Sequence, residues 1–268
     1  MKLAVLLLVC IAAPAFAQES NLKRDTSSTD RGYPPVTDAD RAAAFPDLGN
    51  MTMREHADDN PLNVMVLADR LEIRDARQAS PLVWDASIWV GRDYNKLLLR
   101  TEGEIVKARV EAGNVEALWV RPFARWWDLA VGARHEFQPR QSRSWLALGV
   151  TGLAPYRFQV EATAYVGETG RTALQLQTKY DLLLTNRLIL QPRVELNAYG
   201  RSDRSRGIGS GVSDLELGLR LRYEIRREIA PYFGVAWANK FGSTADLARV
   251  QGVASHEVQV LAGLRVWY

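Results

Sequence analysis

The chain has 268 residues, with 34 Lys and Arg against 31 Asp and Glu and a formal net charge of +3. This near balance excludes a strongly basic nucleic-acid-binding surface, so no nucleic-acid partner is expected. Cys10 is the one cysteine, which excludes an intramolecular disulfide framework.

The first seventeen residues, MKLAVLLLVCIAAPAFA, have the pattern of a secretory signal peptide. Lys2 gives a basic start, an apolar stretch follows, and Ala15-Phe16-Ala17 fits a small-x-small cleavage site. The apolar stretch is well short of the roughly 20 residues that a membrane-spanning helix needs. We therefore expect residues 1–17 to be removed on export, and Cys10 with them.

Residues 18–60 are predicted to form a flexible N-terminal periplasmic arm without regular structure. The segment is polar, contains the pair Pro34-Pro35, and shows no hydrophobic periodicity, which is typical of disordered chain. From residue 61 to residue 268 the character changes, because apolar and polar residues alternate in one segment after another. We expect this part to be a single all-β domain.

Alternation with a period of two predicts strands, because successive side chains point to opposite faces. The clearest case is DLELGLRLRYEI at 214–225, where five Leu and Tyr residues and Ile225 share one face and mostly charged residues share the other. In 96–110 the alternation slips near Ile105, which predicts a bulge. The predicted strands are 63–75, 82–91, 96–110, 114–121, 126–137, 145–154, 157–166, 171–182, 187–199, 213–225, 231–240 and 256–268. Ten strands is the nearest alternative.

The connections between these strands predict a closed transmembrane barrel. They alternate between short turns such as RDYN and APYR and a set that includes the long loops SDRSRGIGSG and GSTADLARVQGVAS. Outer-membrane barrels have tight periplasmic turns at one rim and longer loops at the other. Lipid also requires every backbone polar group to be paired, which a barrel achieves by having no edge. The expected fold is therefore an all-β, antiparallel, up-and-down barrel of about 12 strands.

Two other all-β folds are alternatives to the barrel. A soluble sandwich fits less well, because the predicted strands are long for a sandwich and their polar faces are charged throughout. A β-helix needs sequence repeats at a fixed period, and none is visible.

The charged faces of the strands are expected to line a narrow lumen. In a barrel of about twelve strands such side chains reach across the interior, so ion pairs should fill most of it. Most of these charges are expected to neutralise one another and to hold the shape. The predicted lumen charges include Glu102, Glu104, Asp128, Arg134, Glu161, Arg193, Glu195, Glu216 and Arg220, together with Arg70, Glu72, Asp85, Arg100, Glu136, Lys179, Asp181, Arg222, Glu224 and Arg265.

Long strings of the sequence resemble the copper resistance protein B family. They are HADDNPLN, WDASIWVGRDYNKLLLRTEGE, WDLAVGARHEF, LGVTGLAPYRFQVEATAYVGETGRTAL, YDLLLTNRLILQPRVELNAYG and RGIGSGVSDLELGLRLRYEIRREIAPYFGV. The resemblance extends from His56 to Tyr268. It implies a copper-resistance protein in the outer membrane of a Gram-negative bacterium, in contact with outer-membrane lipid. It also implies copper as cargo or ligand, and a periplasmic multicopper oxidase of the same resistance system as partner.

The candidate copper ligands are few. Copper(I) favours thioether sulfur and imidazole nitrogen, and members of this family usually carry Met- and His-rich repeats in the N-terminal arm. Here the arm retains only MTMREH, with Met51, Met53 and His56, which is weak as a site and equally consistent with a plain linker. His135 and His256 are both predicted near the long-loop rim, where a shared copper or zinc site is possible, although rim histidines are more often only solvated.

Two other function classes remain open at this point. One is a structural barrel, or a docking platform for the copper oxidase, that moves no metal. The other is an outer-membrane enzyme, since barrels of this size include a phospholipase and proteases. A lipase of that type needs a Ser beside a His that is oriented by Asn or Asp. The candidates are Ser142, Ser144 and Ser255 with His135 and His256, but no motif joins them, and we expect no enzyme activity.

Isothermal titration of the refolded protein with Cu(I) and Cu(II) tests the arm. Tight binding of Cu(I) by the full chain that is lost in a chain lacking residues 18–60 would assign the site to Met51, Met53 and His56, which lie there. Binding that persists without the arm would assign it to the barrel instead. No binding by either chain would contradict the arm site and favour a docking platform.

Overall fold

The computed structural model describes residues 35–44, 60–76, 80–138 and 142–268. The predicted signal peptide, and Met51, Met53 and His56, lie outside these residues. The chain divides into two compact units, residues 1–57 and 58–268. In the first unit an exposed helix, α1 (Asp38–Ala44), begins after Thr37. Thr37 Oγ1 accepts a hydrogen bond from the Asp40 N–H (3.2 Å), and Asp40 Oδ2 accepts one from the Thr37 N–H (2.9 Å). This reciprocal cap begins a helix that the sequence analysis did not predict.

The second unit consists almost entirely of antiparallel strands. No helix in the described ranges is long and apolar enough to cross a membrane. Four short helical segments lie between strands: η2 (Pro155–Arg157), η3 (Glu168–Gly170), η4 (Arg204–Arg206) and α2 (Gly242–Val250). The strands are β1 (Asn63–Asp75), β2 (Leu82–Arg92), β3 (Asn95–Val106), β4 (Arg109–Ala124), β5 (Trp127–Phe137), β6 (Arg143–Ala154), β7 (Phe158–Gly167), β8 (Thr172–Lys179), β9 (Leu182–Leu183), β10 (Leu188–Tyr199), β11 (Gly211–Tyr223), β12 (Ile229–Lys240) and β13 (His256–Trp267).

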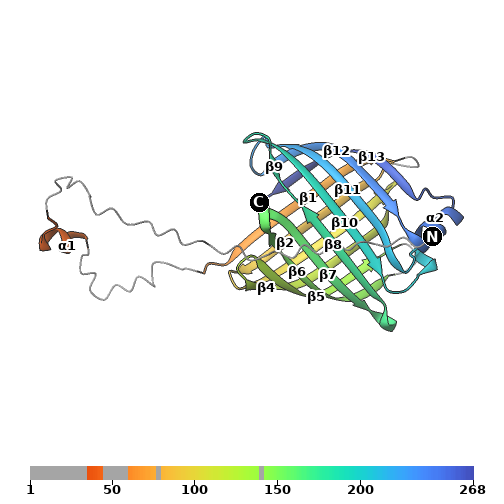
Figure 1. Cartoon of the computed structure of the whole chain (residues 1–268), viewed down its shortest axis with the longest axis horizontal. Helices are drawn as coiled ribbons and strands as arrows, with labels where there is room; N and C mark the ends of the chain where they lie inside the picture. Colours follow the sequence, from red (N-terminus) through yellow and green to blue (C-terminus); the bar gives the residue numbers. More distant parts are fainter. Residues whose placement is uncertain (1–34, 45–59, 77–79, 139–141) are drawn as a thin grey trace, which may run out of the picture. The chain divides into compact units, whose positions relative to one another are not determined.

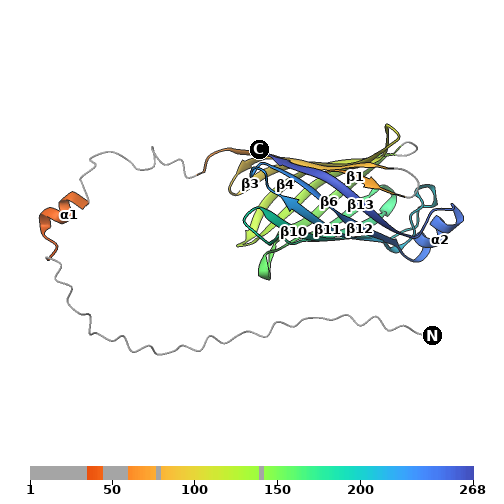
Figure 2. The same cartoon turned by 90° about the horizontal axis from the view of Figure 1, so that it is seen from above.

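These strands close into a barrel (Figure 1). Apart from β8 and β9, each strand pairs antiparallel with the next along the chain, and β1 pairs with β13, for example at Leu71 and Leu264. Figure 2 shows the same closed arrangement from above. Strands β8 and β9 both pair with β10 and together fill one place in the ring. The barrel therefore has twelve strand positions, which confirms the predicted fold class.

The break between β8 and β9 has a simple cause in Pro192. This residue lies in β10 opposite Tyr180, and its carbonyl oxygen accepts a hydrogen bond from the Tyr180 N–H (3.1 Å). Because proline has no N–H, it cannot donate the return bond to the Tyr180 carbonyl. The single strand predicted at 171–182 thus occupies one strand position in the ring. It is interrupted between β8 and β9, where Pro192 of the partner strand has no N–H to donate.

The hairpin between β3 and β4 differs from the prediction. The sequence analysis placed the turn at 111–113, but the chain turns at Lys107 and Ala108, whose φ angles are 49° and 62°. Such a two-residue turn usually contains Asn or Gly, so its sequence signal was missing. Gly113 instead lies within β4, where a Cβ atom would be 2.4 Å from the Phe137 ring. The predicted bulge near Ile105 is confirmed as a register shift between Glu104 and Ile105.

The two faces of the barrel wall have opposite character, as β11 shows. Leu217 and Leu219 are 39% and 43% exposed on the outer face, whereas Arg220 and Arg222 are 2% and 4% exposed on the inner face. Apolar residues on the outside and charged residues on the inside are the reverse of a soluble fold. This is the arrangement that a surrounding lipid phase requires.

The two rims also differ. One rim carries the five short turns, together with the start of β1 and the end of β13. Helix α2 and the loops 200–210 and 241–255 lie at the other rim (Figure 1). In outer-membrane barrels the short turns face the periplasm and the long loops face outward. We use the names short-turn rim and long-loop rim for these two ends.

A charge placed at the centre of the outer face tests the membrane orientation. Leu217→Arg should lower the free energy of unfolding in lipid vesicles by about 2–4 kcal/mol, because a guanidinium at the bilayer midplane loses its hydration. Val212→Arg, near the long-loop end of the same strand, should cost at most about 1 kcal/mol. Urea titration followed by tryptophan fluorescence measures both values, and equal costs would contradict the assigned orientation.

Candidate functional site

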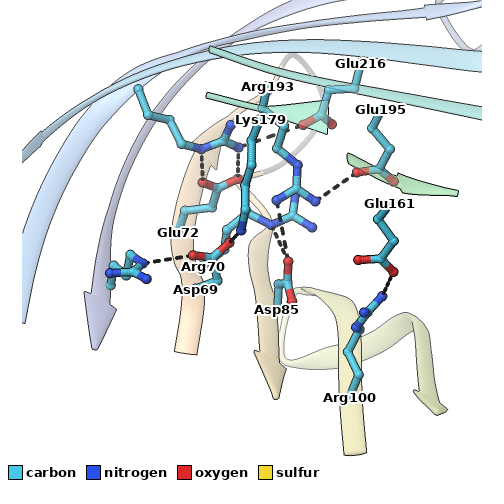
Figure 3. A network of polar contacts seen from close by, with 12 residues as sticks. Asp69, Arg70, Glu72, Asp85, Arg100, Glu161, Lys179, Arg193, Glu195 and Glu216 are labelled. Carbon is cyan, nitrogen blue, oxygen red and sulfur yellow. Dashed lines mark hydrogen bonds and ion pairs between the residues drawn. The ribbon is translucent and has the colours of Figure 1, made fainter. Parts of the chain in front are cut away.

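The lumen of the barrel is the candidate site. Inward-facing positions hold all nine charges given first in the sequence analysis, namely Glu102, Glu104, Asp128, Arg134, Glu161, Arg193, Glu195, Glu216 and Arg220. Ion pairs hold most of them to residues of other strands. Figure 3 shows ten labelled members of this network at close range.

Glu72 on β1 is the most enclosed carboxylate of the network, with 0% of its surface exposed. It accepts two hydrogen bonds from the Arg220 guanidinium, both 3.0 Å long, and one from Arg74 Nε at 2.8 Å. The Tyr232 hydroxyl donates a further bond of 3.0 Å. Arg74 continues the chain of contacts to Glu216, at 2.8 and 3.0 Å. A carboxylate without water is stable only with this degree of compensation.

Asp69 enters the lumen because of a bulge in β1. The register between β1 and β2 shifts between Ala68 and Arg70, so Asp69 is an extra residue. Asp69 and Arg70 are consequently both buried, although neighbours in a regular strand point to opposite faces. Asp69 accepts hydrogen bonds from Lys179 on β8 (2.8 Å) and from Arg265 on β13 (2.9 Å).

A second connection across the lumen runs through Asp85 on β2. Its Oδ2 atom lies 3.2 Å from Arg70 Nε and 3.5 Å from Arg193 Nη1 on β10. Arg193 also pairs with Glu195 at 3.1 Å. Strands β1 and β8 lie far apart around the ring, and so do β2 and β10. The ion pairs that join them therefore bridge the interior (Figure 3).

A third group lies on the inner faces of β3, β4, β5 and β7. Arg100 pairs with Glu161 and lies 3.6 Å from Glu116. The hydroxyl of Tyr165 donates a 2.7 Å hydrogen bond to Glu116, and the Arg134 guanidinium lies over the Tyr165 ring at 4.9 Å. The arginines of this group are thus held by carboxylates and by an aromatic face.

A cavity of about 300 Å³ opens on the long-loop side of these ion pairs, and we call it the vestibule. Glu102 and Glu104, two residues apart on β3, line it. Within the described part of the chain neither carboxylate makes a hydrogen bond or an ion pair. Every arginine of the vestibule does have a carboxylate partner: Arg70, Arg74, Arg134 and Arg206. The vestibule therefore holds two carboxyl groups without a direct hydrogen-bond or ion-pair partner among the described residues.

The loop 200–210 borders the vestibule and is held there by hydrogen bonds and ion pairs. Arg206 in η4 donates hydrogen bonds to Glu136 on β5 (2.6 Å) and to Gln138 (2.9 Å). Asp203 pairs with Arg143 on β6 and with Arg171 (2.7 Å). At its far end the loop is held by α2, where Thr244 Oγ1 accepts a hydrogen bond from the Gly209 N–H (2.8 Å).

Several members of this site are not among the predicted lumen charges. Arg74 shares the alternation of Arg70 and Glu72, and Glu116 shares that of the buried Asn114, so strict counting along the strand would have found both. Asp69 is inward only because of the bulge. Asp203 and Arg206 lie in a loop, where no periodicity indicates direction.

The two histidines are not brought together. His135 lies on β5 and His256 begins β13, with β1 to β4 between them on one side of the ring and β6 to β12 on the other. Both are exposed, because Glu136 and Glu257 take the inward positions of the alternation. No cluster of three His, Cys, Asp or Glu suited to a metal ion occurs among the described residues. A shared two-histidine site is therefore not formed.

His135 has a different neighbour. Its Nδ1 atom lies 3.0 Å from Ser144 Oγ on the adjacent strand β6, at directly opposed register positions. A serine nucleophile also needs a third group to orient its histidine. In the described ranges nothing hydrogen-bonds to the other ring nitrogen of His135, so the pair is a cross-strand contact.

Removal of the central carboxylate tests how far the network stabilises the barrel. Glu72→Gln should lower the free energy of unfolding by about 3–5 kcal/mol, because buried guanidinium groups lose their compensating charge. Asp246→Asn breaks the exposed pair with Arg249 and should cost under about 1 kcal/mol. Urea unfolding in lipid vesicles measures both, and a Glu72→Gln cost as small as that of the control would refute the network's structural role.

Comparison with known proteins agrees with this architecture. A curated copper resistance protein B from Escherichia coli is 43% identical over 253 residues, covering 94% of this chain and 84% of the relative. A copper resistance protein B homolog from Pseudomonas syringae pv. tomato is 46% identical over 235 residues, covering 88% of this chain and 79% of the relative. Among solved structures, the NanC porin superposes with a TM-score of 0.52 at 11% identity, covering 76% of this chain and 99% of the porin, which supports the fold alone.

The family model described as copper resistance protein B precursor (CopB) matches residues 62–268, which is the whole barrel. The resemblance noted from the sequence strings is thereby confirmed, and with it the outer membrane of Gram-negative bacteria as the location. The chain belongs to the copper resistance protein B family.

Proposed function

We propose that this protein binds copper ions at the outer membrane and helps to move them through the lumen, as its part in copper resistance. The family supports copper resistance as the role. The observation that carries the proposal is the pair of carboxyl groups in the vestibule, Glu102 and Glu104, which have no direct partner among the described residues. Two carboxylates in a low-dielectric cavity attract a cation much more strongly than carboxylates in bulk water.

The lumen charges suggest how a cation is received. Asp128, at the short-turn end of β5, likewise makes no ion pair or hydrogen bond with any residue that the structure describes. Unpaired carboxylates therefore lie on both sides of the ion-pair layer formed by Asp69, Asp85 and their partners. A copper ion drawn to either side would meet that layer next, and would compete with Lys179 and Arg193 for the same oxygen atoms.

Tight coordination of a copper ion requires more than electrostatic attraction, because suitable ligand atoms must surround the ion. Copper(II) binds well to imidazole and carboxylate, and copper(I) to thioether sulfur. The described residues supply no cluster of three suitable ligands, so the lumen carboxylates attract the ion but do not chelate it. The segment with Met51, Met53 and His56 offers the softer donors, and we propose it as the place where copper(I) is held.

The alternative function is a structural barrel or docking platform for a periplasmic multicopper oxidase, without metal movement. The many compensated ion pairs of the lumen favour it, because they serve to hold shape. In this alternative Glu102 and Glu104 have no role, since an oxidase partner would contact the rim and not the vestibule. The two functions therefore differ in how they depend on the vestibule.

Substitution of the vestibule carboxylates separates the two functions. In a deletion strain that carries the Glu102→Gln, Glu104→Gln variant, we expect copper tolerance to fall toward that of the deletion strain, because the vestibule no longer attracts the cation. The double variant retains the size and shape of both side chains and removes their negative charge. Growth on graded copper and cellular copper content measure the effect.

The matched control is Asp246→Asn, which removes an exposed carboxylate from α2 outside the vestibule and should leave copper tolerance at the wild-type level. The docking platform would be favoured if the double variant kept wild-type copper tolerance while the deletion strain lost it. Unchanged tolerance and unchanged cellular copper in the deletion strain itself would refute a role in copper resistance for this chain.

A further inference from the structure

The short-turn rim carries exposed arginines in every one of its turns. Arg92 ends β2, Arg157 lies in η2, and the turns before β5, β10 and β12 add one or more each. We call the following exposed residues the arginine ring: Arg92, Arg121, Arg125, Arg157, Arg187 and Arg226. Exposed acids in these turns are Asp93 and Glu228, so the rim is positively charged.

The arginine ring differs from the arginines of the lumen in its lack of partners. Lumen arginines such as Arg220 and Arg193 are held by carboxylates. None of the six guanidinium groups of the ring makes an ion pair or a hydrogen bond with any residue in the described ranges. Each group therefore offers its full set of donors to something outside the barrel.

The direction of these side chains follows from the strands. Arg121 shares the outer face of β4 with Trp119, and the intervening Val120 is buried on the inner face. Arg92 likewise shares the outer face of β2 with the exposed Ile88. These arginines thus point away from the barrel axis, toward the surroundings of the wall, and not into the lumen.

Aromatic residues locate the arginine ring at the membrane surface. Trp126 and Phe123 are 61% exposed beside Arg125, and Tyr156 is 85% exposed beside Arg157. Amphipathic aromatic side chains collect at the level of the lipid headgroups. Guanidinium groups at this level meet phosphate oxygens, which arginine binds bidentately.

We infer that the arginine ring binds the phosphate groups of phospholipids in the periplasmic leaflet, with a preference for anionic phospholipid. The ring extends over all five short turns around the rim (Figure 1). A lipid annulus contacts the whole circumference, whereas a docked protein contacts one patch. The spread of the exposed arginines and the outward direction of Arg92 and Arg121 therefore favour lipid over an acidic periplasmic protein.

Tryptophan quenching by brominated lipids tests this inference on the full chain reconstituted in phosphatidylcholine bilayers with increasing brominated phosphatidylglycerol. The wild type should show a relative binding constant that favours phosphatidylglycerol. In the Arg121→Gln, Arg125→Gln, Arg157→Gln variant this preference should fall by at least about fivefold, because the loss of even one cation near an anionic surface removes on the order of a fivefold factor. High salt should weaken the wild-type preference.

The matched control removes three exposed arginines from the long-loop rim, as Arg109→Gln, Arg204→Gln, Arg249→Gln, and should keep the preference within about twofold of wild type, since one rim alone carries the ring. Arg→Lys substitutions at Arg121, Arg125 and Arg157 leave the charge of the arginine ring unchanged and should retain the preference. Equal loss in both Gln variants, or no preference for phosphatidylglycerol in the wild type, would overturn the inference. The second outcome would leave an acidic protein as the occupant of the rim.

Discussion

The closure of twelve strand positions into a ring, completed by the pairing of β1 with β13, is the constraint on which the rest of the barrel depends. Lipid offers no hydrogen bonds, so an open edge in the membrane would leave its backbone groups unpaired. Closure then fixes the direction of all side chains, because alternate residues must face either acyl chains or the enclosed interior. The apolar residues of β11 and its arginines follow from this single geometric condition. So does the ion-pair network, since charges confined to a narrow lumen are stable only when compensated.

Much of this fold could be read from the sequence, because alternation and connection length are local signals. Twelve strand positions and the difference between the two rims follow from them. Local signals failed where the backbone departs from regularity. The turn at Lys107 and Ala108 lacks the usual Asn or Gly, and the extra residue Asp69 reverses the alternation within β1. The interruption opposite Pro192 depends on the partner strand, which no single segment reveals.

The candidate site was less accessible from the sequence for a physical reason. The inward direction of Glu102 or Arg193 is a property of one strand, but the partner of each charge depends on which strands oppose each other across the closed ring. The pairs Asp69–Lys179 and Asp85–Arg193 join residues more than 100 positions apart in the chain. Asp203 and Arg206 come from a loop and carry no periodic signal. The sequence thus indicated the composition of the lumen, and the structure added its connectivity and the unpaired carboxylates of the vestibule.

The pairs that cross the lumen have a mechanical consequence. Lys179 and Arg193 tie β8 and β10 to carboxylates on β1 and β2, so they act as struts between opposing parts of the wall. A hollow cylinder under the lateral pressure of a bilayer flattens easily into an ellipse, whereas a braced cylinder keeps its circular section. A rearrangement that cleared the interior for an ion would have to release these struts. The proposed passage of an ion would then be coupled to the roundness of the barrel, and the lateral pressure of the membrane would act on both.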